Sequence, residues 1–162
     1  MSTHKTVVAP RSSTAGMLRV IKWDDMFDDG IDLSGDATGW GINLSSNLNF
    51  GKDVVRLQYV FGEGIQNYMN DAPVDVGIVR NPGNATRPIE GEAIPLTASV
   101  IFVDHNWSPM WSSSIGYSRT DTDNLEGQAD DAFNTAQYAL ANLLYTPVAG
   151  VMMGGELQWG RR

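Results

Sequence analysis

The sequence predicts an all-β fold: an antiparallel, up-and-down transmembrane β-barrel, present here as a partial barrel of about seven strands. Three observations predict it. A central hairpin alternates apolar and polar residues along both arms, and aromatic residues stand at both ends of its apolar side. Short turns and long acidic loops follow one another along the chain. Barrels of the bacterial outer membrane combine these features, with short turns at one end and long loops at the other.

The hairpin at residues 37–62 carries the strongest signal. Alternate positions of its two arms are apolar: Trp40, Ile42, Leu44, Leu48 and Phe50, then Val55, Leu57, Tyr59 and Phe61. A period of two residues indicates a strand and not a helix. The turn Gly-Lys-Asp at residues 51–53 separates the arms. Each arm has about 10 residues, the length that a tilted strand needs to cross a bilayer.

Five further strands are expected, over residues 16–23, 96–107, 111–119, 133–145 and 150–160. The alternation settles which face is apolar in the strands at 111–119 and 150–160. It leaves this open for the other three. Asp104 and His105 are neighbours in a strand, so their side chains point to opposite faces and we expect no catalytic pair.

The connections divide into two sets. Short turns lie at residues 51–53, 108–110 and 146–149, and acidic loops lie at residues 24–36, 63–95 and 120–132. We expect the segment 63–95 to be an irregular external loop. The acidic loop 24–36 lacks the spacing of a calcium-binding EF-hand, so no dedicated metal site is expected. Residues 1–14 are expected to form an irregular N-terminal segment, and residues 15–162 the barrel domain.

Composition excludes several classes of protein. The chain has 162 residues, a net charge of −8 and no cysteine. This charge argues against nucleic acid as a partner. No apolar run approaches the about 18 residues of a transmembrane helix. The sequence has no G-x-S-x-G motif, and its histidines are poorly placed for catalysis, so we expect neither an enzyme nor a cofactor.

The strand sequences resemble a known family. The segments ATGWGINLSSNLNFGKD, EAIPLTASVIFVDHNWSPMWSSSIGYS and AQYALANLLYTPVAGVMMGGELQWGRR resemble the C-terminal half of DcaP-like outer-membrane porins, from about residue 15 to the end. The resemblance implies a homotrimer of sixteen-stranded barrels in the outer-membrane lipid of a Gram-negative cell. It also implies passive uptake of small anions, including dicarboxylates and aromatic acids.

The ends of the chain depart from that family. The opening MSTHKTVVAPRSSTAG lacks the apolar core of a signal peptide. Single-chain bacterial barrels have an even number of strands, whereas about seven are expected here. An open sheet in lipid would leave two unpaired edges, which the bilayer does not tolerate. We therefore expect a fragment of a longer porin that aggregates or needs the rest of the barrel.

The polar side of the strands is expected to line a water-filled pore. The predicted pore-lining residues are Arg19, Arg56, Gln58, Glu156 and Gln158 on strands, with Arg80 and Arg87 from the loop 63–95 folded into the mouth as a constriction. Cations on a pore wall concentrate and select anions. The alternative for each is that it only keeps the lumen wet and pairs with nearby acids.

Two classes of function remain in competition. The first is a passive diffusion channel for small hydrophilic, anionic solutes in the outer membrane. The second is a soluble or secreted β-sheet module that binds carbohydrate or another ligand. In that module Trp40, Tyr59, Trp111 and Trp159 would form the core of a two-layer sandwich. Strands longer than the about 5–6 residues usual in soluble proteins favour the channel.

Overall fold

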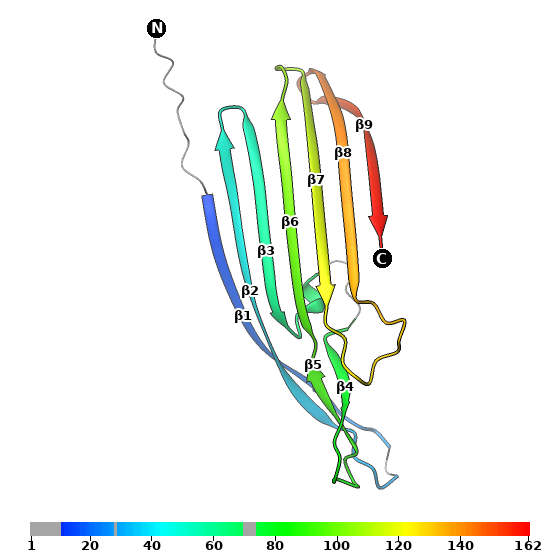
Figure 1. The fold of residues 1–162 in the computed structure, drawn as a ribbon. Coiled ribbons are helices and arrows are strands. Elements are labelled where there is room, and N and C mark those ends of the chain that lie inside the picture. The colour runs from blue at the N-terminus through cyan, green and yellow to red at the C-terminus, as the bar shows by residue number, and fades with distance from the viewer. Residues whose placement is uncertain (1–10, 28, 70–73) are drawn as a thin grey trace.

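The fold is one open, strongly curved antiparallel sheet with a small hairpin at one end (Figure 1). The computed structural model describes residues 11–27, 29–69 and 74–162. Seven strands form the sheet in the order β1-β2-β3-β6-β7-β8-β9, and β4 pairs with β5 separately. The prediction of an all-β, antiparallel, up-and-down sheet of seven strands is confirmed. Among the described residues the sheet is not closed, and β1 and β9 are its edges.

The strands have the following bounds: β1 Arg11–Trp23, β2 Gly35–Phe50, β3 Asp53–Glu63, β4 Val76–Arg80, β5 Ile89–Ala93, β6 Pro95–Asn106, β7 Trp111–Thr122, β8 Thr135–Val148 and β9 Val151–Arg161. Short turns join β2 to β3, β6 to β7 and β8 to β9 at the upper end in Figure 1. We call this the turn end. The longer connections lie at the other end, the loop end.

Several expected boundaries were wrong, those of β1 and β8 among them. Strand β1 begins at Arg11 and not near residue 15, because Ser12 and Ser13 hydrogen-bond to Ser46 and Ser45 of β2 at 2.9 and 2.8 Å. Residues 1–10 of the expected irregular segment lie outside the described residues. Strand β8 continues to Val148 through the expected turn at 146–149. Its pairing with β9 shifts in register between Tyr145 and Val148, which accommodates a proline that has no N–H to donate.

The register divides the sheet into two faces. One row of paired residues runs across six strands: Leu48, Val55, Val103, Ile115, Ala141 and Leu157. We call the face that carries this row the apolar face. The pairing also settles the three strands that the alternation left open, since Leu18, Ile101 and Ala139 all lie on this face. The opposite face, which carries Arg56, is the inner face.

The connection between β3 and β6 contradicts the expected irregular loop. Its described residues contain a 3-10 turn, η1 (Gln66–Tyr68), and the β4–β5 hairpin. Figure 1 shows η1 behind the sheet, on the inner face. Ile65 packs there in a cluster with Val60, Leu96 and Ala98. We call residues 64–69 together with Asp75 the inward segment.

A buried glutamine holds the inward segment in place. The side chain of Gln66 accepts a hydrogen bond from the backbone N–H of Ile65 at 2.9 Å and donates one to the carbonyl of Ile94 at 2.8 Å. Gln66 is fully buried, so these bonds replace the water that its amide would otherwise bind. Among the described residues, no helix has the length and apolar character needed to cross a membrane.

A glycine on the inner face lies in close contact with an aromatic ring. Gly116 of β7 pairs with Phe102 of β6, and a Cβ atom at Gly116 would overlap the phenyl ring. Gly116→Val is therefore expected to lower the free energy of unfolding by about 1–3 kcal/mol through overpacking. Urea unfolding measures this. Gly155→Val is the control, because a Cβ atom at Gly155 meets open space. Equal midpoints for the two variants would contradict the packing.

Candidate functional site

The inner face carries a hydrogen-bonded row of polar side chains across β3, β6, β7 and β8. Arg56 Nε donates to Asp104 Oδ2 at 2.8 Å, and Ser114 Oγ donates to Asp104 Oδ1 at 2.7 Å. The backbone N–H of Ser114 donates to Asn142 Oδ1 at 2.8 Å. These residues stand side by side because Asp104, Ser114 and Asn142 occupy paired positions of neighbouring strands.

The row continues onto the edge strand. Asn142 Nδ2 lies 3.4 Å from Glu156 Oε2, and the Gln158 amide donates to the other oxygen of the same carboxylate. At the other side of the sheet, Gln58 Nε2 donates to Asn43 Oδ1 at 3.1 Å. The structure thus places the predicted residues Arg56, Gln58, Glu156 and Gln158 on one face. That face combines carboxylate, guanidinium and amide groups, which suits contact with hydrated polar solutes.

Arg19 also lies on this face, but it serves as an anchor. Its Nη1 atom is 3.1 Å from Asp75 Oδ2 and 3.3 Å from the carbonyl oxygen of Gly64. The guanidinium also stands 5.5 Å from the ring centre of Tyr68. The Asp75 side chain is 6% exposed, and its other oxygen accepts the backbone N–H of Asn67 at 2.9 Å. Arg19 therefore fixes the inward segment to β1.

Arg80 and Arg87 lie at the loop end and not on the inner face. Arg80 is the exposed last residue of β4. Arg87 makes an ion pair with Asp32 of the β1–β2 loop at 2.8 Å, beside a backbone bond from Asp32 N–H to the carbonyl of Thr86. The part of the connection that reaches the inner face is the inward segment, where Ile65 packs against Val60 and Leu96.

The Arg87–Asp32 pair predicts a pH response of the loop end. The hydrogen bond from Arg87 is the largest cause that lowers the pKa of Asp32 from 3.8 to about 2. Because the pKa of Asp32 is lowered in the folded protein, its ionised form stabilises the contact at pH values above the ordinary pKa of 3.8. This stabilisation is lost as the pH falls through about 2. NMR titration of the Asp32 carboxyl carbon is expected to show this midpoint, and Arg87→Gln to move it upward. A midpoint near 3.8 in both proteins would contradict the pair.

Charges on the inner face balance. The described residues of the sheet and the inward segment place three cations there, Arg11, Arg19 and Arg56, and three carboxylates, Asp75, Asp104 and Glu156. Arg11, Asn47 and Arg56 occupy one row of pairs on neighbouring strands. Any preference for anions therefore depends on guanidinium groups that stay accessible, and Arg56 is 53% exposed.

Several members of this site were absent from the sequence prediction, among them Arg11, Asp104 and Asn142. Arg11 was missed because residues 1–14 were assigned to an irregular segment. Asp104 and Asn142 were missed because the facing of their strands was open. The single Asn within the apolar run YALANLLY was the available signal for Asn142, since a polar residue in such a strand marks the face that meets water.

Carboxylates of the acidic loops bond to the backbone of their own loop. Asp25, Asp29 and Asp32 accept hydrogen bonds from backbone N–H groups of their own loop. In the part of the chain that the structure describes, no three His, Cys, Asp or Glu side chains are grouped to hold a metal ion. Asp104 and His105 do lie on opposite faces, because His105 pairs with Asp53 at 2.9 Å on the apolar face.

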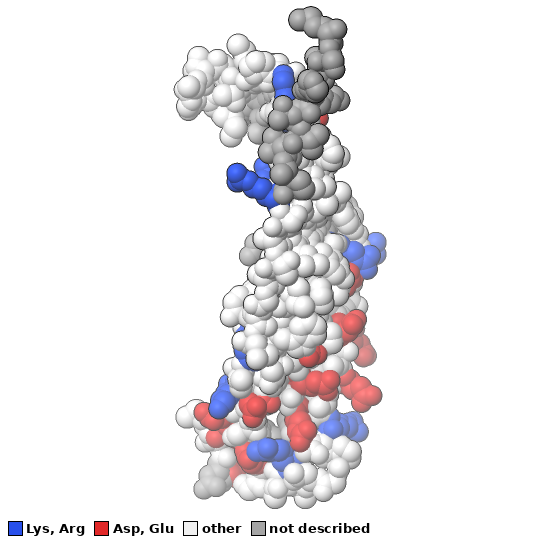
Figure 2. All heavy atoms as spheres, turned by 90° about the vertical axis from the view of Figure 1, so that its left-hand side faces the viewer, with Lys and Arg blue, Asp and Glu red and all other residues white. Residues whose placement is uncertain are grey.

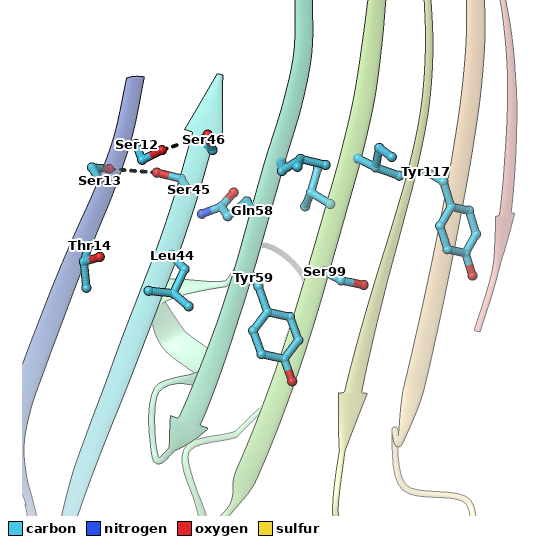
Figure 3. A pocket seen from close by; sticks show the side chains of 13 residues that line it. Ser12, Ser13, Thr14, Leu44, Ser45, Ser46, Gln58, Tyr59, Ser99 and Tyr117 are labelled. Atoms are coloured by element: carbon cyan, nitrogen blue, oxygen red, sulfur yellow. Dashed lines mark hydrogen bonds between the residues drawn. The ribbon is translucent and has the colours of Figure 1, made fainter. Parts of the chain in front are cut away.

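The apolar face is uncovered by other described residues. Leu157, Leu18 and Ile115 are 80, 77 and 62% exposed. A shallow hollow of about 550 Å³ lies in this face. Figure 3 shows Tyr59 on β3 and Tyr117 on β7 among its lining residues, and the hydrogen bond between Ser12 and Ser46 at its β1–β2 side. An apolar surface of this extent, spread over seven strands, marks a site of contact with lipid or protein.

Comparisons with protein-family models, curated proteins and solved structures find no match to this chain.

Proposed function

We propose that the sheet is part of the wall of an outer-membrane β-barrel through which small hydrophilic solutes, anions among them, diffuse passively. The observation that carries the proposal is the separation of the two faces. One face bears exposed apolar side chains and a band without charges, and the other bears the polar row from Arg56 to Gln158.

The band without charges has the height of a membrane. On β3, the apolar face has no charged side chain between Asp53 and Glu63, a distance of ten residue steps. At about 3.3 Å per residue this is about 33 Å along the strand. With the tilt of about 35–45° typical of such barrels, its height becomes about 25 Å, which matches their apolar band.

Charges and aromatic rings mark both limits of the band. On the loop side the apolar face carries Lys22, Asp36, Glu63, Arg119, Asp121 and Arg161. On the turn side it carries Asp53 and His105. Trp111 stacks on Tyr145 at 4.5 Å near the turns, and Trp40 contacts Phe61 at 6.0 Å near the loops. Figure 2 shows acidic side chains gathered in the half that carries the long loops.

The strand directions restrict how the sheet closes. Strands β1 and β9 both run from the turn end to the loop end, as Figure 1 shows. Antiparallel closure therefore needs an odd number of further strands, of which the first and the last run the other way. A second copy with its loops on the same side fails this condition, since both of its edges run in the same direction as β1 and β9.

The inward segment is the part of the chain that would narrow the pore. It stands on the inner face and is held by the buried groups of Gln66 and Asp75. Solutes that pass along the inner face therefore meet η1 as well as the strands. We assign the narrowing of the pore to this segment and not to Arg80 and Arg87.

The preference for anions is tested at Arg56. In bilayers that contain the protein, Arg56→Ala is expected to shift the reversal potential in a salt gradient toward lower anion preference. Asp104→Asn is expected to shift it the other way, because it removes the carboxylate that binds Arg56 at 2.8 Å. Arg87→Ala serves as a control at the loop end. If the reversal potentials of Arg56→Ala and Asp104→Asn were unchanged, Arg56 would not line the pore.

The competing proposal is the soluble module that binds carbohydrate. It requires a second layer over the apolar face, and the described residues supply none, since Leu157 and Leu18 stay exposed. Extraction from cell envelopes separates the two proposals. Recovery only with detergent supports the channel, whereas a folded monomer in detergent-free buffer supports the module. Assembly as a homotrimer remains a prediction of the family resemblance.

A further inference from the structure

A small groove lies between the inward segment and the inner face of β1, β2 and β3. Its volume is about 250 Å³. Apolar side chains form its walls: Met17 on β1, Val60 on β3, and Ile65 and Met69 on the inward segment. The groove exists because Gly41 admits Ile65, whose Cδ1 atom would lie only 2.8 Å from a Cβ atom at that position.

Two amide side chains stand at one rim of this groove. Gln58 Nε2 donates to Asn43 Oδ1 at 3.1 Å. One bond between two primary amides uses one N–H and one oxygen, so one carbonyl oxygen and one NH2 group remain. Neither has another hydrogen-bond partner among the described residues. If the oxygen and nitrogen of both amides were exchanged, one carbonyl oxygen and one NH2 group would still remain. The rim therefore offers one hydrogen-bond donor group and one acceptor side by side.

The groove carries no charge on its described lining residues. Arg19 stands beside it, but this guanidinium contacts the ring of Tyr68 and is held by Asp75 at 3.1 Å. Tyr68 itself is 64% exposed and supplies an aromatic face at the opening. An ionised ligand would lose its hydration here without gaining an opposite charge, which disfavours carboxylates.

We propose that this groove binds a small, planar, uncharged molecule with a primary carboxamide on an apolar ring. A carboxamide presents one oxygen and one NH2 group, which complement the free donor and acceptor of Asn43 and Gln58. The ring lies between the methionines and Tyr68, where thioether and aromatic contacts are favourable. The volume is smaller than the about 300–1,000 Å³ of pockets for drug-sized ligands, so a single ring is the fitting size.

This binding does not require the sheet to line a membrane pore, so it goes beyond the proposed function. It depends only on the contact between the inward segment and β1–β3. It also opposes the anion preference assigned to Arg56, because the groove favours a neutral amide over the acid of the same shape. The two proposals therefore fail independently.

The test compares benzamide with benzoate on the protein extracted in detergent at pH 7. Saturation-transfer NMR titrations are expected to show saturable binding of benzamide and binding of benzoate weaker by roughly tenfold or more, because the acid leaves the acceptor at the rim unpaired. Equal or tighter binding of benzoate would overturn the proposal. So would the absence of saturable benzamide binding.

Matched variants locate the site. Gln58→Leu and Asn43→Leu are each expected to weaken benzamide binding by roughly tenfold. Asn47→Leu is the control, because Asn47 lies on the same face of β2 but does not line the groove. Equal losses in all three variants would overturn the assignment. The comparison of benzamide with benzoate needs no variant, so it stands even where a substitution disturbs folding.

Discussion

Ile101→Arg is expected to prevent the sheet from inserting into a bilayer, whereas Val100→Arg is expected to be tolerated. Ile101 lies in the middle of the band without charges, in register with Leu57 and Tyr117, and it is 45% exposed. An arginine at the centre of a lipid-facing band costs about 2–4 kcal/mol. Val100 directly precedes Ile101 in β6, and its side chain is on the inner face beside Gln58.

Folding into liposomes, followed by the protease-resistant fraction, measures this difference. We expect the equilibrium constant for insertion of Ile101→Arg, calculated from this fraction, to fall by roughly thirtyfold or more, as 2–4 kcal/mol implies. Val100→Arg controls for the added charge, because it differs from Ile101→Arg only in the face of the sheet on which the arginine stands. Equal insertion of the two variants, or correct folding of Ile101→Arg in buffer without detergent, would contradict a lipid-facing role for the apolar face.

Arg19→Met is expected to destabilise the protein and to release the inward segment. The substitution leaves the Asp75 carboxylate, which is 6% exposed, without its cation. Breaking a buried ion pair in this way costs about 3–5 kcal/mol; we expect the lower end, because Arg19 is itself 22% exposed. Single-channel conductance is expected to rise, because the segment that narrows the pore loses its attachment to β1.

The double variant Arg19→Met with Asp75→Leu sharpens this test. Removing both charges leaves no unpaired charge, so stability in urea is expected to recover in part; the Asn67 N–H still loses its acceptor. Arg87→Met is the control for loss of an arginine, because the Arg87–Asp32 pair is exposed and contributes little. If Arg19→Met unfolded at the same urea concentration as Arg87→Met, the ion pair would not anchor the segment.

The central hairpin was predictable because its signal is local. Alternation of apolar and polar residues along β2 and β3 is enough to place the strands, the turn and the two faces, and the register confirms them. The alternation is weaker in β8, where Tyr138, Leu140 and Leu144 lie on the inner face with Asn142. Its facing became clear only through pairing with β7.

The inward segment was not predictable by the same means. Residues 64–69 lie within a long polar segment rich in Gly, Asn and Pro, so the composition around them indicates an exposed loop. Residues 64–66 are nevertheless buried, because Gln66 bonds to Ile94 and because Asp75 meets Arg19, which is 56 positions away. Contacts over such distances depend on the curvature and register of the whole sheet, and no local pattern records them.

Periodicity alone was therefore sufficient for the class of fold, the seven strands and the division into turn end and loop end. These depend on side chains that alternate along one strand. The roles of the arginines were decided by tertiary contacts, which bury Arg19 against Asp75, bind Arg56 to Asp104 and hold Arg87 at the loop end. The physical reason is that the charge an arginine presents to a solute depends on which carboxylate the folded chain brings within about 4 Å of it.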